Sequence, residues 1–70
     1  MVHLDVSDLV PPEPMVRILE AAASLQPHQR LIIEHQRRPV YLYPQLDAQG
    51  YVHETTELGP GRVEIRIWRA

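Results

Sequence analysis

Hydrophobic and polar residues alternate along several segments of the chain, as they do in strands that bury one face. The alternation is most regular near the C-terminus, where Val63, Ile65 and Ile67 are separated by polar or amphipathic residues. The Gly-Pro-Gly sequence at residues 59–61 predicts a tight turn before this segment, so the last two strands form a hairpin. The pattern predicts four strands, at residues 2–6, 30–35, 51–58 and 63–68.

Between the first two predicted strands, hydrophobic residues recur at helical spacing. The proline-rich segment at residues 11–14 suits the first turn of a helix, because the backbone N–H groups there have no helical partner. Glu13 and Arg17 stand four residues apart, in the favourable order for an ion pair. These features predict an amphipathic helix of about three turns that ends before Pro27. Its apolar stripe consists of Met15, Ile18, Leu19, Ala22 and Leu25.

A second, shorter helix is predicted between the second and third strands. Leu42 and Leu46 lie one turn apart, and Gly50 is suited to the end of a helix. Pro44 is compatible only with the first turn, so the regular helix should begin near Tyr41 or Leu42.

The order strand, helix, strand, helix, strand, strand predicts one α+β domain over residues 1–70. A helical connection makes the first two strands parallel, whereas the hairpin is antiparallel, so the four-stranded sheet is mixed. Both helices should cover the same face, giving a two-layer α/β sandwich. The second face of the sheet would then be open to water or to a partner.

Composition restricts the classes of function. Seven basic residues stand against nine acidic ones, and all seven are arginines without a basic cluster that would favour nucleic acid. Because cysteine is absent, thiol catalysis and thiolate metal sites are excluded. No apolar run is long enough to span a membrane, and the first residues are not expected to act as a signal peptide, so a cytoplasmic location is expected. No catalytic arrangement of serine, histidine and carboxylate emerges, so we expect no enzyme.

The first third of the sequence resembles the opening of the TusA-like (SirA-like) sulfur-carrier domains. Leu4-Asp5, a short spacer, and then the motif Pro11, Pro12, Glu13 and Pro14 follow the carrier pattern of Leu-Asp and Cys-Pro-x-Pro. The chain is closer still to a sister family of small bacterial domains of unknown function. The similarity to that family extends to Met15, to the Arg-Pro pair at residues 38–39 and to the Gly-Pro-Gly turn.

The resemblance implies the fold and also marks a departure in chemistry. Where the sulfur carrier has its cysteine, this chain has Pro11, which has neither a thiol nor an N–H. The remaining motif residues, Pro12, Glu13 and Pro14, keep the structural task of starting the helix. The surface at this helix start would at most be a docking site for partners that differ from those of the sulfur carriers. Members of the resembled family are sometimes joined to hemerythrin-like or cupin domains. This association implies that such domains work in redox or oxygen-related surroundings.

The open face of the sheet is the first candidate for a binding site. Trp68, Arg66, Glu34 and Ile32 should project from it, and an exposed tryptophan beside an arginine is typical of protein interfaces. The alternative is that Trp68 packs on a neighbouring strand. A domain of this size buries only about 60% of its unfolded surface, so a protein partner or a homodimer is expected.

Two further candidates involve ionisable side chains. His3, His35 and His53 lie on three predicted strands, and His3 and His53 would share the open face if the strand register allows. Together with Asp5 or Glu54 such a set would suit a transition metal, although the spacing matches no ligand motif. The second candidate is an anion site at Arg37 and Arg38 before the second helix, with Tyr41 and Tyr43 lining a shallow pocket.

The sequence therefore favours a non-enzymatic protein-interaction or regulatory module, without a cofactor, on a TusA-like scaffold that lacks the carrier cysteine. The alternative is a metal- or haem-responsive accessory domain that uses the histidines.

Overall fold

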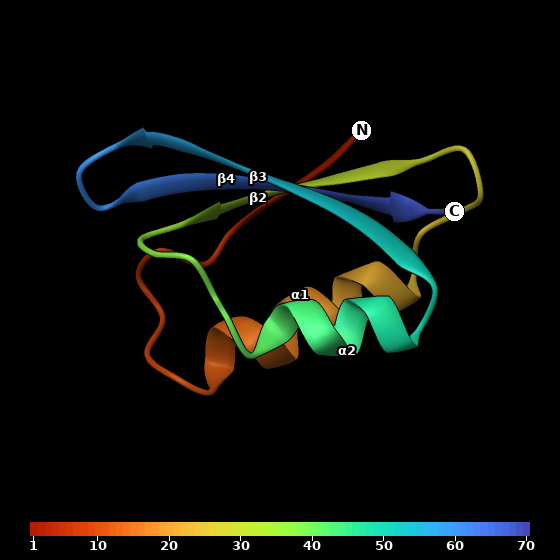
Figure 1. Cartoon of the computed structure of the whole chain (residues 1–70), viewed down its shortest axis with the longest axis horizontal. Coiled ribbons are helices and arrows are strands. Elements are labelled where there is room, and N and C mark those ends of the chain that lie inside the picture. The colour runs from red at the N-terminus through yellow and green to blue at the C-terminus, as the bar shows by residue number, and fades with distance from the viewer.

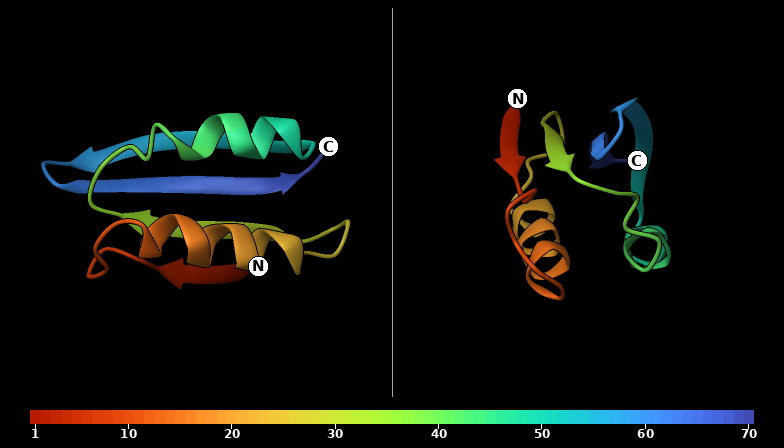
Figure 2. Two further views of the ribbon diagram at one scale, coloured as in Figure 1. Left: turned by 90° about the horizontal axis from the view of Figure 1, so that it is seen from below. Right: turned by 90° about the vertical axis from the view of Figure 1, so that its left-hand side faces the viewer.

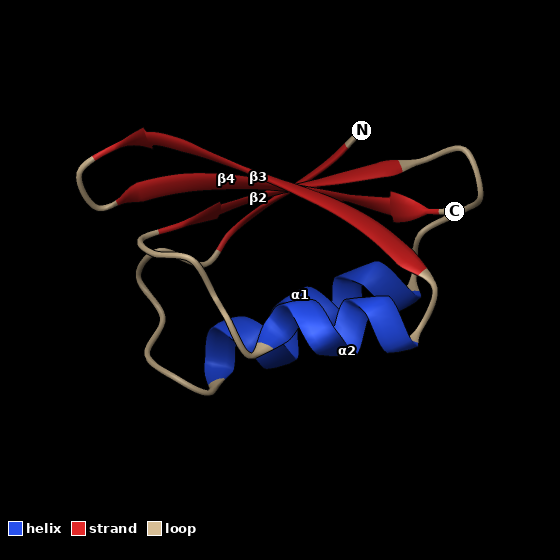
Figure 3. Ribbon diagram, viewed as in Figure 1, coloured by secondary structure: helices blue, strands red, loops and turns tan.

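A computed structural model describes all seventy residues of the chain. It contains four strands and two helices in the predicted order (Figures 1 and 3). The elements are β1 (Val2–Asp5), α1 (Glu13–Ala23), β2 (Arg30–His35), α2 (Leu42–Ala48), β3 (Tyr51–Gly59) and β4 (Arg62–Arg69).

The strands form one mixed sheet in the order β1-β2-β4-β3. β1 and β2 are parallel, as the helical connection between them requires, and Leu4 pairs with Ile33. β4 is antiparallel to both of its neighbours, so that Ile65 lies between Ile33 of β2 and Thr55 of β3. The predicted hairpin is therefore confirmed, with β4 in the interior of the sheet and β3 at its edge.

Both helices lie on one face of the sheet (Figure 2). α1 runs beneath β1 and β2, whereas α2 runs beneath the β3–β4 hairpin, and no helix covers the opposite face (Figure 2). The two-layer α+β sandwich predicted from the sequence is confirmed. α2 begins at Leu42, with Pro44 in its first turn, as the proline restriction requires.

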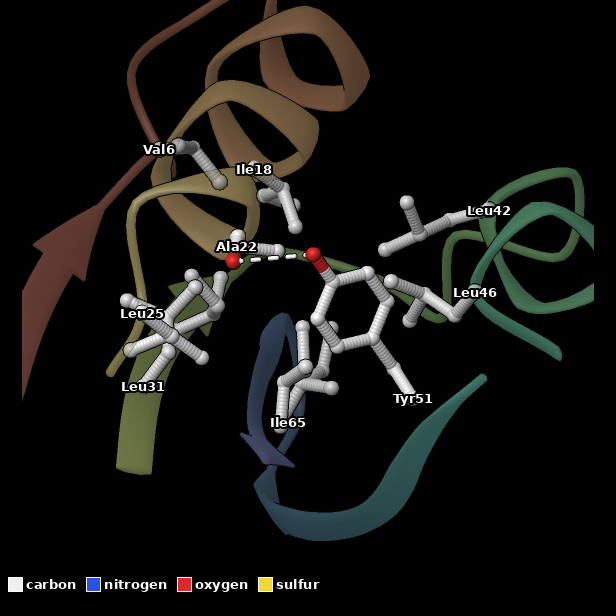
Figure 4. Close-up of a cluster of buried hydrophobic side chains, with 11 residues drawn as sticks. Val6, Ile18, Ala22, Leu25, Leu31, Leu42, Leu46, Tyr51 and Ile65 are labelled. Carbon is white, nitrogen blue, oxygen red and sulfur yellow. Dashed lines mark hydrogen bonds between the residues drawn. The ribbon is translucent and has the colours of Figure 1, made fainter. Parts of the chain in front are cut away.

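The core lies between the two layers and is aliphatic except for one tyrosine. Ile18 and Ala22 of α1, together with Leu42 and Leu46 of α2, have no exposed surface. Tyr51 extends from β3 into the space between the helices, and its hydroxyl donates a hydrogen bond to the backbone oxygen of Ala22 at 3.0 Å (Figure 4). The full cluster is Val6, Ile18, Ala22, Leu25, Leu31, Ile33, Leu42, Leu46, Tyr51, Ile65 and Ile67.

The C-terminal end of α1 is held by residues from the far end of the chain. α1 has no basic residue in its last turn. Arg69 of β4 instead donates from Nε to the backbone oxygen of Leu25 at 3.1 Å. The same guanidinium lies 5.4 Å from the centre of the Tyr51 ring. The helix end thus receives a positive charge, which favours it electrostatically, from a strand that is distant in sequence.

Candidate functional site

The uncovered face of the sheet carries the four residues predicted for it. Leu31, Ile33, Ile65 and Ile67 are buried against the helices. Because side chains alternate along a strand, Ile32, Glu34, Arg66 and Trp68 project from the opposite face. The register aligns Ile32 with Arg66 and Arg30 with Trp68 in directly paired positions.

Ile32 contributes little to the surface that this face presents. Its exposed fraction is only 6%, although no helix covers it. His3 and Arg66 are its direct neighbours on the two flanking strands. Ile32 therefore offers less surface to a partner than its predicted position on this face suggests.

Trp68 is half-buried and packs on a neighbouring strand, which was the alternative reading of its position. The guanidinium carbon of Arg30 lies 4.2 Å from the centre of the indole ring, within the range of a cation–π contact. Trp68 and Arg30 therefore form a stacked pair with an apolar and a charged part on this face. Arg66 lies in the next row of paired residues, opposite Ile32.

Three carboxylates cross the other end of this face in one row. Asp5 pairs with Glu34, and Glu34 pairs with Glu64, so the row runs across three adjacent strands. Arg66 donates from Nε to Glu64 at 2.9 Å, whereas Glu34 takes part in no ion pair. The hydroxyl of Ser7 donates a hydrogen bond to the carboxylate of Asp5, and so does the backbone amide of Ser7. Both bonds lower the pKa of this carboxyl, and the bond from the hydroxyl has the larger effect. We call Asp5, Glu34 and Glu64 the acidic row.

The three histidines proposed as metal ligands lie apart. His3 is exposed on the uncovered face, whereas His53 pairs with the core residue Ile67 and faces α2. There it stacks on Tyr43 with ring centres 4.7 Å apart and forms a 3.0 Å hydrogen bond to Asp47. The expectation that His53 joins His3 is therefore wrong. No group of three or more histidines or carboxylates in the structure is placed to hold a metal ion.

His35, the last residue of β2, faces the helix layer and is only 7% exposed. Its Nδ1 accepts the backbone N–H groups of Gln36 at 2.9 Å and Arg37 at 3.3 Å. Burial lowers the pKa of His35, and the positive charge of Arg37 lowers it further as the smaller effect. The ring is therefore neutral near pH 7. Because Nδ1 is an acceptor, its proton lies on Nε2.

His35 lies at a cleft of which only one side, at Arg37, Arg38 and Tyr41, was predicted from the sequence. The cleft has a volume of about 350 Å³ and a predominantly apolar surface. One wall is the start of α1 and the segment before it, and the other is the connection between β2 and α2. The lining residues are Leu9, Pro11, Pro12, Pro14, Met15 and residues 35–42. We call this the motif cleft.

The motif Pro11–Pro14 begins α1 and also forms one wall of the motif cleft. α1 starts at Glu13, Pro14 is buried in the first turn, and the bond between Pro11 and Pro12 is cis. These residues therefore lie where the sequence predicted the start of the first helix. Their position facing residues 35–42 was missed, because no local pattern indicates which distant segment packs against a helix start.

The two arginines predicted as an anion site differ in their surroundings. Arg38 donates from Nε to Glu57 of β3 at 2.8 Å, and this carboxylate raises the pKa of the guanidinium. Arg37 forms no ion pair, and both residues border the motif cleft. Tyr41 also borders it, as predicted, but Tyr43 instead bonds to Thr55 and stacks on His53. The two arginines thus differ in that only Arg38 has a carboxylate partner.

Known proteins are similar to this chain in sequence and in fold. A model of the family described as "Uncharacterized conserved protein (DUF2249)" matches residues 3–69. The crystal structure of a SirA-like protein from Desulfitobacterium hafniense superposes with a TM-score of 0.82 at 24% identity, covering 96% of this chain and 95% of that one. A search of the curated proteins finds no match.

The fold likeness agrees with the arrangement of strands and helices described above, and no helix is long and apolar enough to cross a membrane. The family match extends over nearly the whole sequence, including the proline motif, the β2–α2 connection and the final hairpin. The chain therefore belongs to the DUF2249 family and has a SirA-like fold.

Proposed function

We propose that this chain is a non-enzymatic interaction module that binds a partner protein through the uncovered face of its sheet. The observation that carries the proposal is the acidic row. Like charges in directly opposite positions on neighbouring strands destabilise a sheet. A fold that keeps three carboxylates in such positions bears their mutual repulsion, and a partner with basic side chains would relieve it.

The other end of the same face supplies a second type of contact. Trp68 and Arg30 form a stacked pair there, and tryptophan and arginine are the side chains most often found at interface hot spots. The partner we propose therefore presents basic residues to the acidic row and an apolar or aromatic group to Trp68.

The non-enzymatic part of the proposal rests on the residue at the carrier position. In SirA-like folds with a carrier cysteine, the sulfur atom is the reactive group, and here Pro11 stands in its place. A proline side chain has no group that can form a persulfide or transfer a proton. A SirA-like fold without this nucleophile favours binding as the remaining task.

The experiment is quantitative affinity capture from a native lysate, with three forms of the immobilised chain. One is the wild type, one carries Trp68→Ala with Arg66→Ala, and one carries Glu34→Lys. All three positions lie on the sheet surface without a helix above them, so the variants should fold, which circular dichroism checks. We expect a partner that the wild type enriches and that both variants lose by at least about tenfold.

A matched control is Arg37→Gln, which removes a charge from the connection between β2 and α2, at the motif cleft. It should retain the partner. Identical partner profiles for wild type and both face variants would refute the proposal. Size-exclusion chromatography with light scattering on the same proteins tests the homodimer: if only the wild type dimerises, the partner is a second copy.

A further inference from the structure

The motif cleft combines apolar walls with a buried donor and a free positive charge. We propose that it binds a small organic acid, with an apolar body between the proline-rich walls and one carboxylate that reaches His35 and Arg37. This site is separate from the uncovered face, so the inference goes beyond the function proposed above.

The size and walls of the cleft suit a small apolar body. Its volume of about 350 Å³ is at the lower end of the range for small-molecule sites. Pro11, Pro14 and Met15 form one wall, and Val40 and Tyr41 stand on the opposite side. Val40 is 61% exposed and Tyr41 is 82% exposed. Apolar side chains left in water at the mouth of a cleft gain free energy when a ligand covers them.

The polar end of the cleft is the His35 ring. More than nine-tenths of this side chain is buried, and it lines the cleft. The two backbone amides of Gln36 and Arg37 occupy Nδ1, so Nε2 carries the ring proton. No protein group accepts this proton, and Nε2 is not fully enclosed, because no fully buried side-chain nitrogen or oxygen of the chain lacks a hydrogen-bond partner. A donor that retains access to solvent on an otherwise buried ring can be reached by an acceptor on a ligand.

The positive charge of Arg37 indicates that the ligand atom accepting this hydrogen bond is negatively charged. It borders the cleft without a carboxylate partner, whereas its neighbour Arg38 is held by Glu57 at 2.8 Å. No acidic side chain lines the cleft. A ligand oxygen near His35 would therefore meet a positive charge that nothing else neutralises, which favours a carboxylate over a neutral carbonyl.

A free small acid fits better than the C-terminus of a peptide. Peptides are usually held by main-chain hydrogen bonds as well as by their end group. Four lining residues, Pro11, Pro12, Pro14 and Pro39, have no backbone N–H to offer. The cleft also lies beyond the end of β2, where no unpaired strand edge accepts an extended chain.

The test is a titration of the ¹⁵N-labelled chain, followed by backbone amide and histidine ring signals. Three probes separate the parts of the ligand: phenylacetate, its neutral isostere phenylacetamide, and acetate, which lacks the apolar body. We expect phenylacetate to shift the amides of residues 9–15 and 35–42 together with the His35 ring. The other two probes should bind at least about tenfold more weakly, the loss typical of a charged hydrogen bond or of a buried ring.

Two variants assign the polar contacts. Arg37→Gln removes the free charge from an exposed position and should weaken phenylacetate binding about tenfold. His35→Asn removes the Nε2 donor, but its side-chain oxygen can still accept the amides of Gln36 and Arg37, so the turn is preserved. It should weaken binding to a similar degree. Arg62→Gln, at the exposed start of β4 and outside the cleft, is the matched control and should bind phenylacetate like the wild type.

Three results would overturn the proposal. Phenylacetamide could bind as tightly as phenylacetate, or Arg37→Gln and His35→Asn could both bind like the wild type. A tetrapeptide of three glycines and a C-terminal phenylalanine could bind at least tenfold more tightly than phenylacetate, which would assign the cleft to a chain end. Each result leaves the capture experiment on the uncovered face unaffected, because the two proposals use different residues.

Discussion

The hydroxyl of Tyr51 and the backbone oxygen of Ala22 form a buried hydrogen bond that joins β3 to α1 across the core (Figure 4). Tyr51 is the only aromatic residue in the core cluster, and its ring lies between the two helices (Figure 4). The same carbonyl accepts the amide of Leu25 at 3.1 Å, so it retains one partner when the hydroxyl is removed.

Replacing Tyr51 by phenylalanine should therefore have a moderate effect on stability. The ring still fills the core, and the loss is one hydrogen bond, worth about 1 kcal/mol. For a domain of this size that corresponds to a decrease in Tm of roughly 4–8 °C, measurable by thermal denaturation. An unchanged Tm would show that the bond contributes nothing to folding.

Arg69 and Tyr51 should act together on the end of α1. Arg69→Gln removes the charge near the Leu25 carbonyl and the contact with the Tyr51 ring. We expect a loss of about 1 kcal/mol in urea denaturation. In the double variant with Tyr51→Phe, the losses should not add, because the two side chains are in contact. Strict additivity would contradict a shared role.

The stability of the chain should fall as the pH is lowered through the range in which histidine titrates. Burial, followed by the charge of Arg37, keeps the pKa of His35 below the ordinary value of 6.5. Between that lowered pKa and 6.5 the unfolded chain binds more protons than the folded one, so the free energy of unfolding decreases with decreasing pH. The decrease should begin as the pH falls through about 6.5 and should end once the pH lies below the lowered pKa of His35.

His35→Asn is the control for this pH dependence, because it removes the titrating ring and keeps the acceptor for the two amides. The dependence between neutral and mildly acidic pH should become shallower in this variant. Asp5 contributes in a separate range: the pKa of its carboxyl is already low in the folded state, so its stabilisation is lost only at more acidic pH. An identical slope in His35→Asn would contradict the assignment.

Glu34→Gln should stabilise the chain. It removes the central charge of the acidic row and its repulsion with Asp5 and Glu64, worth about 0.5 kcal/mol at low ionic strength. The gain should shrink in high salt, where charges on the surface are screened. Glu20→Gln, on the exposed side of α1, is the matched control and should change the stability little. A destabilised Glu34→Gln variant would remove the argument on which the partner-binding proposal rests.

The elements were predictable because each one is encoded locally. Alternation located the strands, the proline at position 44 limited the start of α2, and the glycines near position 60 marked the hairpin. Leu25 was expected in the apolar stripe of α1, but the helix ends at Ala23 and Leu25 enters the core from the following turn. A hydrophobic period does not distinguish the last helical turn from the segment after it.

The sites were less predictable, because they depend on contacts between distant segments. Tyr51 and Val52 are adjacent apolar residues, so alternation alone did not define which one faces the helices, and His53 was assigned to the wrong face. The low exposure of Ile32 follows from its cross-strand neighbours, which are known only once the register is known. The motif cleft joins residues 9–15 to residues 35–42, a pairing that no local pattern indicates.

The alternation of β2 also determines how the two proposed sites relate to each other. Glu34 projects from the uncovered face, and its neighbour His35 projects to the side of the helices. Under the two proposals, a small acid and a protein partner would therefore approach β2 from opposite sides. A chain with both sites would then act as an adaptor that carries a small acid while attached to its partner.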